Sequence, residues 1–254
     1  MDNLFDLRNK TALITGSSRG LGFTLAKGLA EAGAKVILNS ETPEHLENSR
    51  KTMESSGFDV LAFVFDVNSE EEAGAAIDEI EKTSGPIDIL INNAGYQFRG
   101  PLENFPVDKW RKILDVNLTG AFITSKQVAR HMIKRQAGKI INICSLQSEF
   151  GRKTIAPYAA SKGGLKMLTR AMAVEWGSHN IQVNGIGPGY FKTEMTSALW
   201  NDEEFDSWVK NRTPAGRWGD TEELIGTMIY LATAASNFVS GQVIFVDGGV
   251  SVSM

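Results

Sequence analysis

Short apolar runs rich in β-branched residues alternate with longer helical patterns along most of this chain. In the first half, strands are expected at 11–15, 35–38 and 60–65, and helices at 23–32, 43–55 and 70–83. Strands separated by helices in this way pair in parallel, because each helix carries the chain back across the sheet. The strand runs are nearly continuously apolar, which is typical of strands buried on both faces. The pattern predicts an α/β fold with a doubly wound parallel sheet.

The alternation resumes after the third helix. Strands are expected at 87–91, 139–145, 181–185 and 242–246, and helices at 107–135, 156–178 and 221–234. A polar and aromatic stretch at 190–218 interrupts the rhythm, and an insertion this late in a doubly wound sheet suits a lid. No repeat or linker-like segment divides the 254 residues, so we expect a single domain over residues 1–254.

Composition excludes several classes of function. A formal charge of -4 provides no basic field for nucleic acid, and no apolar run is long enough to span a bilayer. Residues 1–6 lack the organisation of a signal peptide, and the single cysteine, Cys144, has no partner for an internal disulfide. Cys144 lies in an apolar run and is interpreted as a buried structural thiol. We expect a cytoplasmic protein that binds neither nucleic acid nor membrane.

A glycine cluster follows the first expected strand and leads into the first expected helix. Its glycines are Gly16, Gly20 and Gly22 within the segment 15–22. Glycines here permit a tight turn and close approach to a pyrophosphate, and the helix N-terminus adds unpaired amides and a positive dipole end. The spacing differs from the usual Gly-x-Gly-x-x-Gly, but the strand before it and the helix after it provide the context that predicts dinucleotide binding.

The end of the second strand bears on the choice of dinucleotide. An acidic residue there commonly holds the ribose 2′-hydroxyl of NAD, but Asn39 and Ser40 are neutral. Arg19 in the glycine loop is suited to an additional phosphate, whereas Glu41 argues for NAD if it points inward. NADP(H) is therefore favoured and NAD(H) stays an alternative.

Asp66, after the third strand, either accepts a hydrogen bond from adenine or caps the next helix.

Tyr158 and Lys162 are four residues apart on an expected helix and therefore share one face. A neighbouring ammonium favours the phenolate, so the pair is expected to exchange a proton with a substrate near neutral pH.

His45, His131 and His179 have no chelating spacing, and we expect no metal site.

Several motifs occur together in a fixed order. They are Thr15-Gly16-x-x-x-Gly20-x-Gly22, Asn92-Asn93-Ala94-Gly95, Asn117, Ser145, Tyr158-x-x-x-Lys162 and Pro188-Gly189. On these residues the whole chain resembles the short-chain dehydrogenase/reductase family. The resemblance implies a single-domain Rossmann-like fold with a seven-stranded parallel sheet, a nicotinamide dinucleotide cofactor and a homotetramer.

The resemblance also implies roles for individual residues. Tyr158 would be the general acid and base, and Lys162 would lower its pKa and hold the nicotinamide ribose. Ser145 would bond the substrate oxygen, and Asn117 would anchor a water in a proton relay. Together with Tyr158 and Lys162, the implied cofactor contacts are Gly16, Ser18, Arg19, Gly20, Leu21, Gly22, Ser40, Asp66, Val67, Asn93, Ala94, Gly95, Pro188, Gly189, Phe191 and Thr193.

The segments 142–149, 189–196 and 245–249 are similar to family members that act on sugar acids, so a sugar-acid substrate is expected. Such a substrate needs a cation for its carboxylate, and Arg99 is the leading candidate. The other candidate substrate contacts are Ser145, Gln147, Glu149, Arg152 and Tyr158. A 3-oxoacyl-carrier-protein reductase or another carbonyl reductase of the family is the main alternative. A dinucleotide-sensing regulator is a remote one, because such a protein should have lost catalytic groups.

Overall fold

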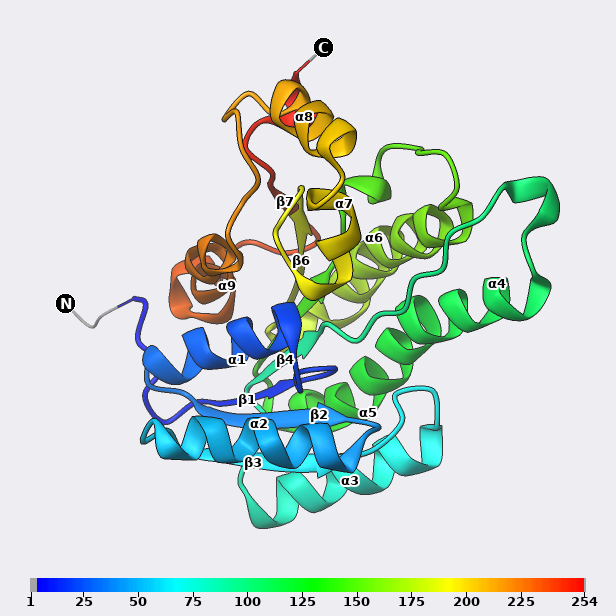
Figure 1. The fold of residues 1–254 in the computed structure, drawn as a ribbon. Helices are drawn as coiled ribbons and strands as arrows, with labels where there is room; N and C mark the ends of the chain where they lie inside the picture. The colour runs from blue at the N-terminus through cyan, green and yellow to red at the C-terminus, as the bar shows by residue number, and fades with distance from the viewer. Residues whose placement is uncertain (1–3, 254) are drawn as a thin grey trace.

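The computed structural model describes residues 4–253, in which seven parallel strands form one sheet in the order β3-β2-β1-β4-β5-β6-β7 (Figure 1). This arrangement is the doubly wound α/β fold expected from the sequence. The strands are β1 Thr11–Ile14, β2 Lys35–Ser40, β3 Val60–Val64, β4 Ile89–Asn92, β5 Gly138–Ile143, β6 Ile181–Pro188 and β7 Val243–Val246.

The strand order reverses beside β1. Ile14 at the end of β1 is in register with Leu38 of β2 on one side and with Ile91 of β4 on the other. The chain leaves β1 towards the β2 side and later returns to continue at β4, so the connecting loops diverge at this point. In open α/β sheets a ligand crevice forms at such a switch point, outside the carboxyl ends of the strands.

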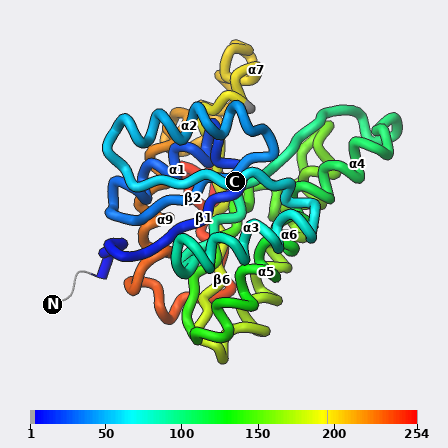
Figure 2. Tube along the Cα trace, turned by 90° about the horizontal axis from the view of Figure 1, so that it is seen from below, coloured from blue at the N-terminus to red at the C-terminus, as the bar shows by residue number. Residues whose placement is uncertain are grey.

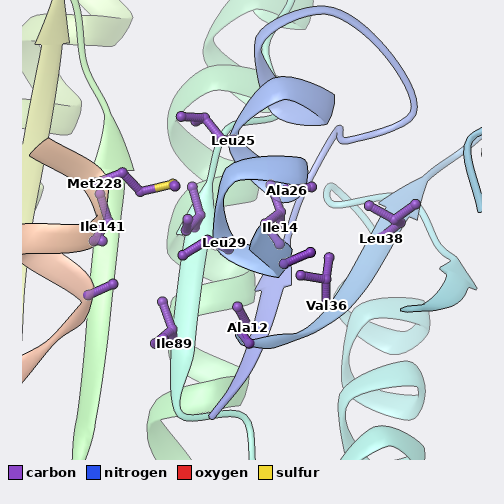
Figure 3. Close-up of a cluster of buried hydrophobic side chains, with 14 of the residues drawn as sticks. Ala12, Ile14, Leu25, Ala26, Leu29, Val36, Leu38, Ile89, Ile141 and Met228 are labelled. Carbon is purple, nitrogen blue, oxygen red and sulfur yellow. The ribbon is translucent and has the colours of Figure 1, made fainter. Parts of the chain in front are cut away.

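Helices cover both faces of the sheet (Figures 1 and 2). One layer contains α1 Gly20–Glu31, α2 Pro43–Ser55 and α9 Ile225–Ala232, and the other contains α3 Glu70–Thr83, α5 Gly120–Arg135 and α6 Ala156–Trp176. Figure 3 shows how the first layer packs, with Leu25 and Leu29 of α1 on the side of Ile14 in β1 and Met228 of α9 beside Ile141 in β5. These side chains are all at most 1% exposed. Burial of strands on both faces explains their continuous apolar sequence.

The helix expected at 107–135 is interrupted. It consists of α4 Val107–Leu114, a π-helical turn Asp115–Thr119 and α5 Gly120–Arg135. The π turn contains Asn117, whose side chain is only 1% exposed and bonds to neighbouring segments. The expected helical bounds of 107–135 are therefore confirmed, and the π turn inside them is a feature that the local pattern did not indicate. Single π turns of this kind occur frequently at functional sites.

The interruption expected at 190–218 contains short helices of its own. They are a 3₁₀ turn Glu194–Thr196, α7 Ser197–Trp200 and α8 Glu203–Arg212. Asp202 caps α8 by accepting a hydrogen bond from the Phe205 amide. In Figure 1 this segment lies above the carboxyl ends of β6 and β7.

Within residues 4–253, no helix combines the length and apolarity needed to cross a membrane.

Candidate active site

The glycine loop between β1 and α1 packs tightly against the loop after β4. A Cβ on Gly16 would lie 2.8 Å from the Ala94 Cα, and one on Gly22 would lie 2.4 Å from the Asn93 Nδ2. Gly20 has a φ of +56° and faces open space, since nothing lies within 4 Å of a Cβ placed there. Larger residues would therefore displace the loop at Gly16 and Gly22, and strain the backbone at Gly20.

Asn93 and Thr15 hold this loop in place. The Asn93 Nδ2 donates to the carbonyl oxygens of Thr15 at 3.0 Å and Gly16 at 2.9 Å. In return the Thr15 hydroxyl accepts from the amides of Asn93 at 3.0 Å and Ala94 at 3.1 Å. Asn93 was predicted to contact the cofactor, but its side chain is occupied in positioning the glycine loop. The sequence motif contained Thr15 without indicating this role.

The local structure fits a dinucleotide pyrophosphate. Helix α1 begins at Gly20, and the side chain of its N-cap residue Arg19 makes no capping hydrogen bond. Leu21 and Gly22 follow in the first turn, where backbone amides have no intrahelical acceptors. These amides lie at the positive end of the helix dipole, next to Gly20, beside which there is open space. Such an arrangement forms an anion-binding site.

The neighbouring end of β2 carries hydroxyl groups. Ser18 donates to the Ser40 hydroxyl at 3.3 Å, and the Asn39 side chain is buried beneath the loop, where it accepts from the Gly16 amide at 3.3 Å. Glu41 is exposed. Arg19 extends into solvent and forms an ion pair with Glu194 at 3.3 Å. The region therefore presents the neutral side chains of residues 39 and 40, the exposed carboxylate of Glu41, and a guanidinium paired with Glu194.

Asp66 and Val67 follow β3 at the same edge of the sheet. The Asp66 Oδ1 accepts a hydrogen bond from the Asn68 amide at 2.9 Å, whereas Ser69 is the N-cap of α3. The alternative in which Asp66 caps the helix is therefore wrong. Val67 is 7% exposed and packs beside Gly120, where an added Cβ would lie 2.8 Å from its side chain.

Ser145 lies just beyond the end of β5 and is 6% exposed. Its hydroxyl donates to the Gln147 Oε1 at 2.7 Å and accepts from the Gln147 amide at 3.2 Å. Its hydroxyl also lies close enough to the Tyr158 phenol to favour the lower pKa of that group. The turn after β5 therefore holds the hydroxyl beside the phenol, as the sequence predicted.

Lys162 lies one helical turn beyond Tyr158 on α6. Its side chain is 4% exposed, and its Nζ donates to the Ile143 carbonyl at 2.6 Å. The Nζ is 5.8 Å from the centroid of the Tyr158 ring. The structure therefore brings Ser145, Tyr158 and Lys162 together at the carboxyl end of β5.

Burial dominates the electrostatics of this group. It raises the pKa of Tyr158 above its usual value, although the neighbouring Ser145 hydroxyl opposes the shift. Burial also lowers the pKa of Lys162 to about 8. The expected lowering of the Tyr158 pKa by Lys162 stays a prediction.

Asn117 connects the loop after β4 to α6. Its Oδ1 accepts from the Tyr96 amide at 2.7 Å, and its Nδ2 donates to the Tyr96 carbonyl at 3.1 Å and the Ser161 hydroxyl at 3.2 Å. Ser161 in turn donates to the Tyr158 carbonyl at 2.8 Å. These contacts position the first turn of α6, which carries Tyr158. The water relay through Asn117 stays a prediction.

The remaining cofactor candidates follow β6. Pro188 ends the strand, and a Cβ on Gly189 would lie 2.6 Å from the Asp247 Cα, so only glycine fits there. Phe191 is 7% exposed and belongs to the core packed by α1 and α9. Thr193 caps the 3₁₀ turn at 194–196 by accepting from the Thr196 amide. Phe191 and Thr193 therefore shape the base of the insertion.

The candidate substrate residues divide into two groups. Arg99 and Arg152 lie on adjacent loops, joined by a hydrogen bond from the Gly100 amide to the Thr154 carbonyl at 3.0 Å. Glu149 instead forms an ion pair with Lys166 of α6. The substrate contacts of Arg99, Arg152, Glu149 and Gln147 stay predictions. No cluster of three or more potential metal ligands occurs among residues 4–253.

A pyrophosphate cradle at the first strand, with serine, tyrosine and lysine converging at the fifth, defines a Rossmann-like oxidoreductase that uses a nicotinamide dinucleotide. The model of the short chain dehydrogenase family matches residues 10–204. The chain belongs to this family.

Several known proteins are similar to this chain over all or nearly all of its length. It is 54% identical to the 5-keto-D-gluconate 5-reductase of Escherichia coli (strain K12), over 100% of both chains. It is 51% identical to the gluconate 5-dehydrogenase of Gluconobacter oxydans (strain 621H), over 99% of this chain and 98% of the relative. The crystal structure of a gluconate 5-dehydrogenase from Burkholderia cenocepacia J2315 in complex with NADP and tartrate is 52% identical, with a TM-score of 0.97, covering 99% of this chain and 98% of the other.

Proposed function

We propose that the protein reversibly interconverts D-gluconate and 5-keto-D-gluconate with NADP(H) as cofactor. The observation that carries this proposal is the identity of 54% over the full chain to a 5-keto-D-gluconate 5-reductase, in a fold that juxtaposes Ser145, Tyr158 and Lys162. The short-chain fold accommodates many substrates, so the specific reaction rests on the full-length similarity, and the chemistry rests on the site.

A bound nicotinamide dinucleotide supplies the hydride acceptor or donor. In oxidation the phenolate of Tyr158 takes the hydroxyl proton of the substrate, and in reduction the protonated phenol donates a proton to the carbonyl oxygen. Ser145 donates a hydrogen bond to the reacting oxygen, for which its hydroxyl must turn away from Gln147. Lys162 brings a cation close to the phenol and, as the family resemblance implies, holds the nicotinamide ribose.

The preference for NADP(H) over NAD(H) rests on the end of β2. Neither Asn39 nor Ser40 is acidic, Glu41 is exposed, and Arg19 reaches out from the glycine loop. A 2′-phosphate at this place would meet hydroxyl groups and would compete with Glu194 for the Arg19 guanidinium.

Arg19→Ala is expected to weaken NADPH binding about tenfold and to leave NADH binding within about threefold, because a charge-assisted bond to the additional phosphate is lost. Fluorescence titration of both reduced cofactors measures the two affinities. Glu194→Gln is the control, because it breaks the 3.3 Å ion pair while keeping Arg19. Equal weakening of NADPH and NADH would remove Arg19 from phosphate recognition.

The carrier-protein reductase alternative requires a basic docking surface near the crevice. The basic residues Arg130, Lys134 and Arg135 lie towards the C-terminal end of α5, which leads into the start of β5 at the opposite end of the sheet from Ser145. Arg135 is also paired with Glu81 at 2.9 Å. This placement favours a structural role for these cations.

The proposed function is tested by comparing kcat/KM for NADPH-dependent reduction of 5-keto-D-gluconate and of an acetoacetyl thioester. We expect the sugar acid to be reduced much more efficiently. A higher value for the thioester would favour the carrier-protein alternative, and cofactor binding without turnover of any carbonyl compound would favour the regulator.

We further propose that the chain is a single dinucleotide-binding and catalytic domain, with residues 190–218 acting as a lid, and that it works as a cytoplasmic homotetramer. Exposed apolar side chains on α5 and α6 support assembly: Phe122 is 45% exposed, Met167 59% and Val174 85%. A surface of this kind on neighbouring helices suits burial against another copy of the chain.

A further inference from the structure

An ion pair joins the glycine loop to the insertion at 190–218. The Arg19 guanidinium lies 3.3 Å from the Glu194 carboxylate, and the two residues are 175 positions apart in the sequence. Figure 1 shows the start of α1, which follows Arg19, next to the turn that precedes α7. The two segments follow the carboxyl ends of β1 and β6, so the pair lies at the edge of the sheet where the crevice forms.

Hydrogen bonds to the residue before Arg19 hold the glycine loop against the end of β2. The Ser18 hydroxyl donates to the Ser40 hydroxyl at 3.3 Å, and the Ser18 carbonyl accepts from the Ser49 hydroxyl of α2 at 2.5 Å. Arg19 follows directly, so its guanidinium can reach a phosphate that lies beside these hydroxyls. The guanidinium that pairs with Glu194 is therefore the same group that a 2′-phosphate would require.

The Glu194 carboxylate is carried by a short turn that is anchored to the core. The Thr193 hydroxyl accepts from the Thr196 amide at 3.2 Å, and the Thr196 hydroxyl donates to the Phe191 carbonyl at 2.7 Å. Phe191 is 7% exposed and belongs to the core packed by α1 and α9. The turn therefore presents the carboxylate to Arg19 from a backbone that is held in place.

The ion pair itself is exposed and therefore weak. The side chains of Arg19 and Glu194 are 67% and 66% exposed, and water and salt screen charges at such positions. A phosphate monoester carries more negative charge than a carboxylate and forms charge-assisted hydrogen bonds with a guanidinium. A bound 2′-phosphate should therefore take Arg19 from Glu194, and the loss of the pair subtracts from the gain in binding.

We propose that Glu194 limits the preference for NADP(H), because it holds Arg19 in an ion pair that the 2′-phosphate must break. NAD(H) has a hydroxyl at this position and leaves the pair intact. The proposal rests on the cofactor site of the proposed function. It makes Glu194 a specificity-determining residue for the cofactor, one that acts through Arg19.

Direct repulsion is the other way in which a carboxylate weakens the binding of a phosphate. Glu41, which is exposed at the end of β2, is a second carboxylate on this side of the crevice. Repulsion acts between the carboxylate and the phosphate whether or not Arg19 is present. Competition for Arg19 disappears when Arg19 is removed, so a double variant separates the two effects.

The test measures the Kd of NADPH and of NADH by fluorescence titration in the wild type, Glu194→Gln, Arg19→Ala and the double variant. Glu194→Gln should bind NADPH about three- to fivefold more tightly, because no exposed ion pair has to be broken. Its affinity for NADH should be unchanged. In the Arg19→Ala background, Glu194→Gln should have no effect on the affinity for NADPH.

Glu204→Gln is the matched control, because it removes an exposed carboxylate from α8 of the same insertion and leaves the pair with Arg19 in place. It should bind both cofactors as the wild type does. Unchanged or weaker NADPH binding in Glu194→Gln would overturn the proposal, as would an equal gain with NADPH and NADH. An equal gain in the Arg19→Ala background would replace competition with direct repulsion.

These titrations contain no sugar acid, so their outcome is distinct from failure of the proposed function. In that case the wild type would bind the reduced cofactor but would not reduce 5-keto-D-gluconate.

Discussion

Tyr158→Phe is expected to lower turnover of gluconate about 10²- to 10⁴-fold, which is the usual range for loss of a general acid or base. The phenol lies close to Ser145 and is held beside Lys162, and phenylalanine keeps the ring while removing the proton-transferring oxygen. Because the chief loss lies in proton transfer, NADPH affinity should stay within about threefold of the wild type. Steady-state kinetics and a fluorescence titration of NADPH measure the two effects.

Tyr230→Phe is the matched control for this substitution. Tyr230 lies on α9 and packs against the core on that side of the sheet, outside the group formed by Ser145, Tyr158 and Lys162. Its variant should retain wild-type turnover. Near-normal turnover in Tyr158→Phe would exclude Tyr158 as the proton-transferring group.

Lys162→Met is expected to lower the turnover of the enzyme while it raises the free energy of unfolding. Turnover should fall at least about 10²-fold, because the cation beside the phenol is lost. The folded protein should nevertheless gain on the order of 1–3 kcal/mol at pH 7, since methionine fits a buried position without the cost of burying a charge. The gain is limited by the loss of the hydrogen bond to the Ile143 carbonyl. Urea unfolding at pH 7 measures the free energy.

The pH dependence of this gain has a definite sign. The Lys162 pKa is about 8 in the folded protein and 10.5 at its ordinary value, so between these pH values the unfolded chain binds more protons. The wild-type protein therefore becomes more stable, relative to Lys162→Met, as pH rises from about 8 to about 10.5. The advantage of the variant should be fully present below pH 8 and shrink by pH 10. A constant difference between pH 7 and pH 10, or one that matches the exposed control Lys153→Met, would contradict the assigned burial.

The parts of the fold with a strong local signal were predictable from the sequence. Helices α2 and α3 have the expected bounds, because Thr42 precedes Pro43 at the start of one and Ser69 caps the other at a clear change of pattern. Continuous apolar runs likewise located the strands to within a few residues. Convergence of Ser145, Tyr158 and Lys162 followed from a strand end and a helix start that a parallel sheet brings together.

Long-range contacts account for what the sequence did not show. The π turn at 115–119 depends on hydrogen bonds from Asn117 to Tyr96 and Ser161, which are distant along the chain. Asn93 was expected to contact the cofactor, and only the structure shows its amide engaged by the glycine loop. The raised Tyr158 pKa depends on burial, which residue spacing alone does not reveal.

The pairing of Arg99 with Arg152 shows the same limit. Each residue was a separate candidate in the sequence, and a hydrogen bond between residues 100 and 154 joins the two loops that carry them. The contact of Arg152 with Phe205 joins segments more than fifty residues apart, at 4.5 Å. No local pattern indicates such a contact.

The proposed reaction at carbon 5 is tested most directly by incubating the wild-type protein with 5-keto-D-gluconate and NADPH and identifying the product by NMR. We expect D-gluconate to form in proportion to the NADPH consumed. Formation of the carbon-5 epimer, L-idonate, or no consumption of NADPH would contradict the proposed function.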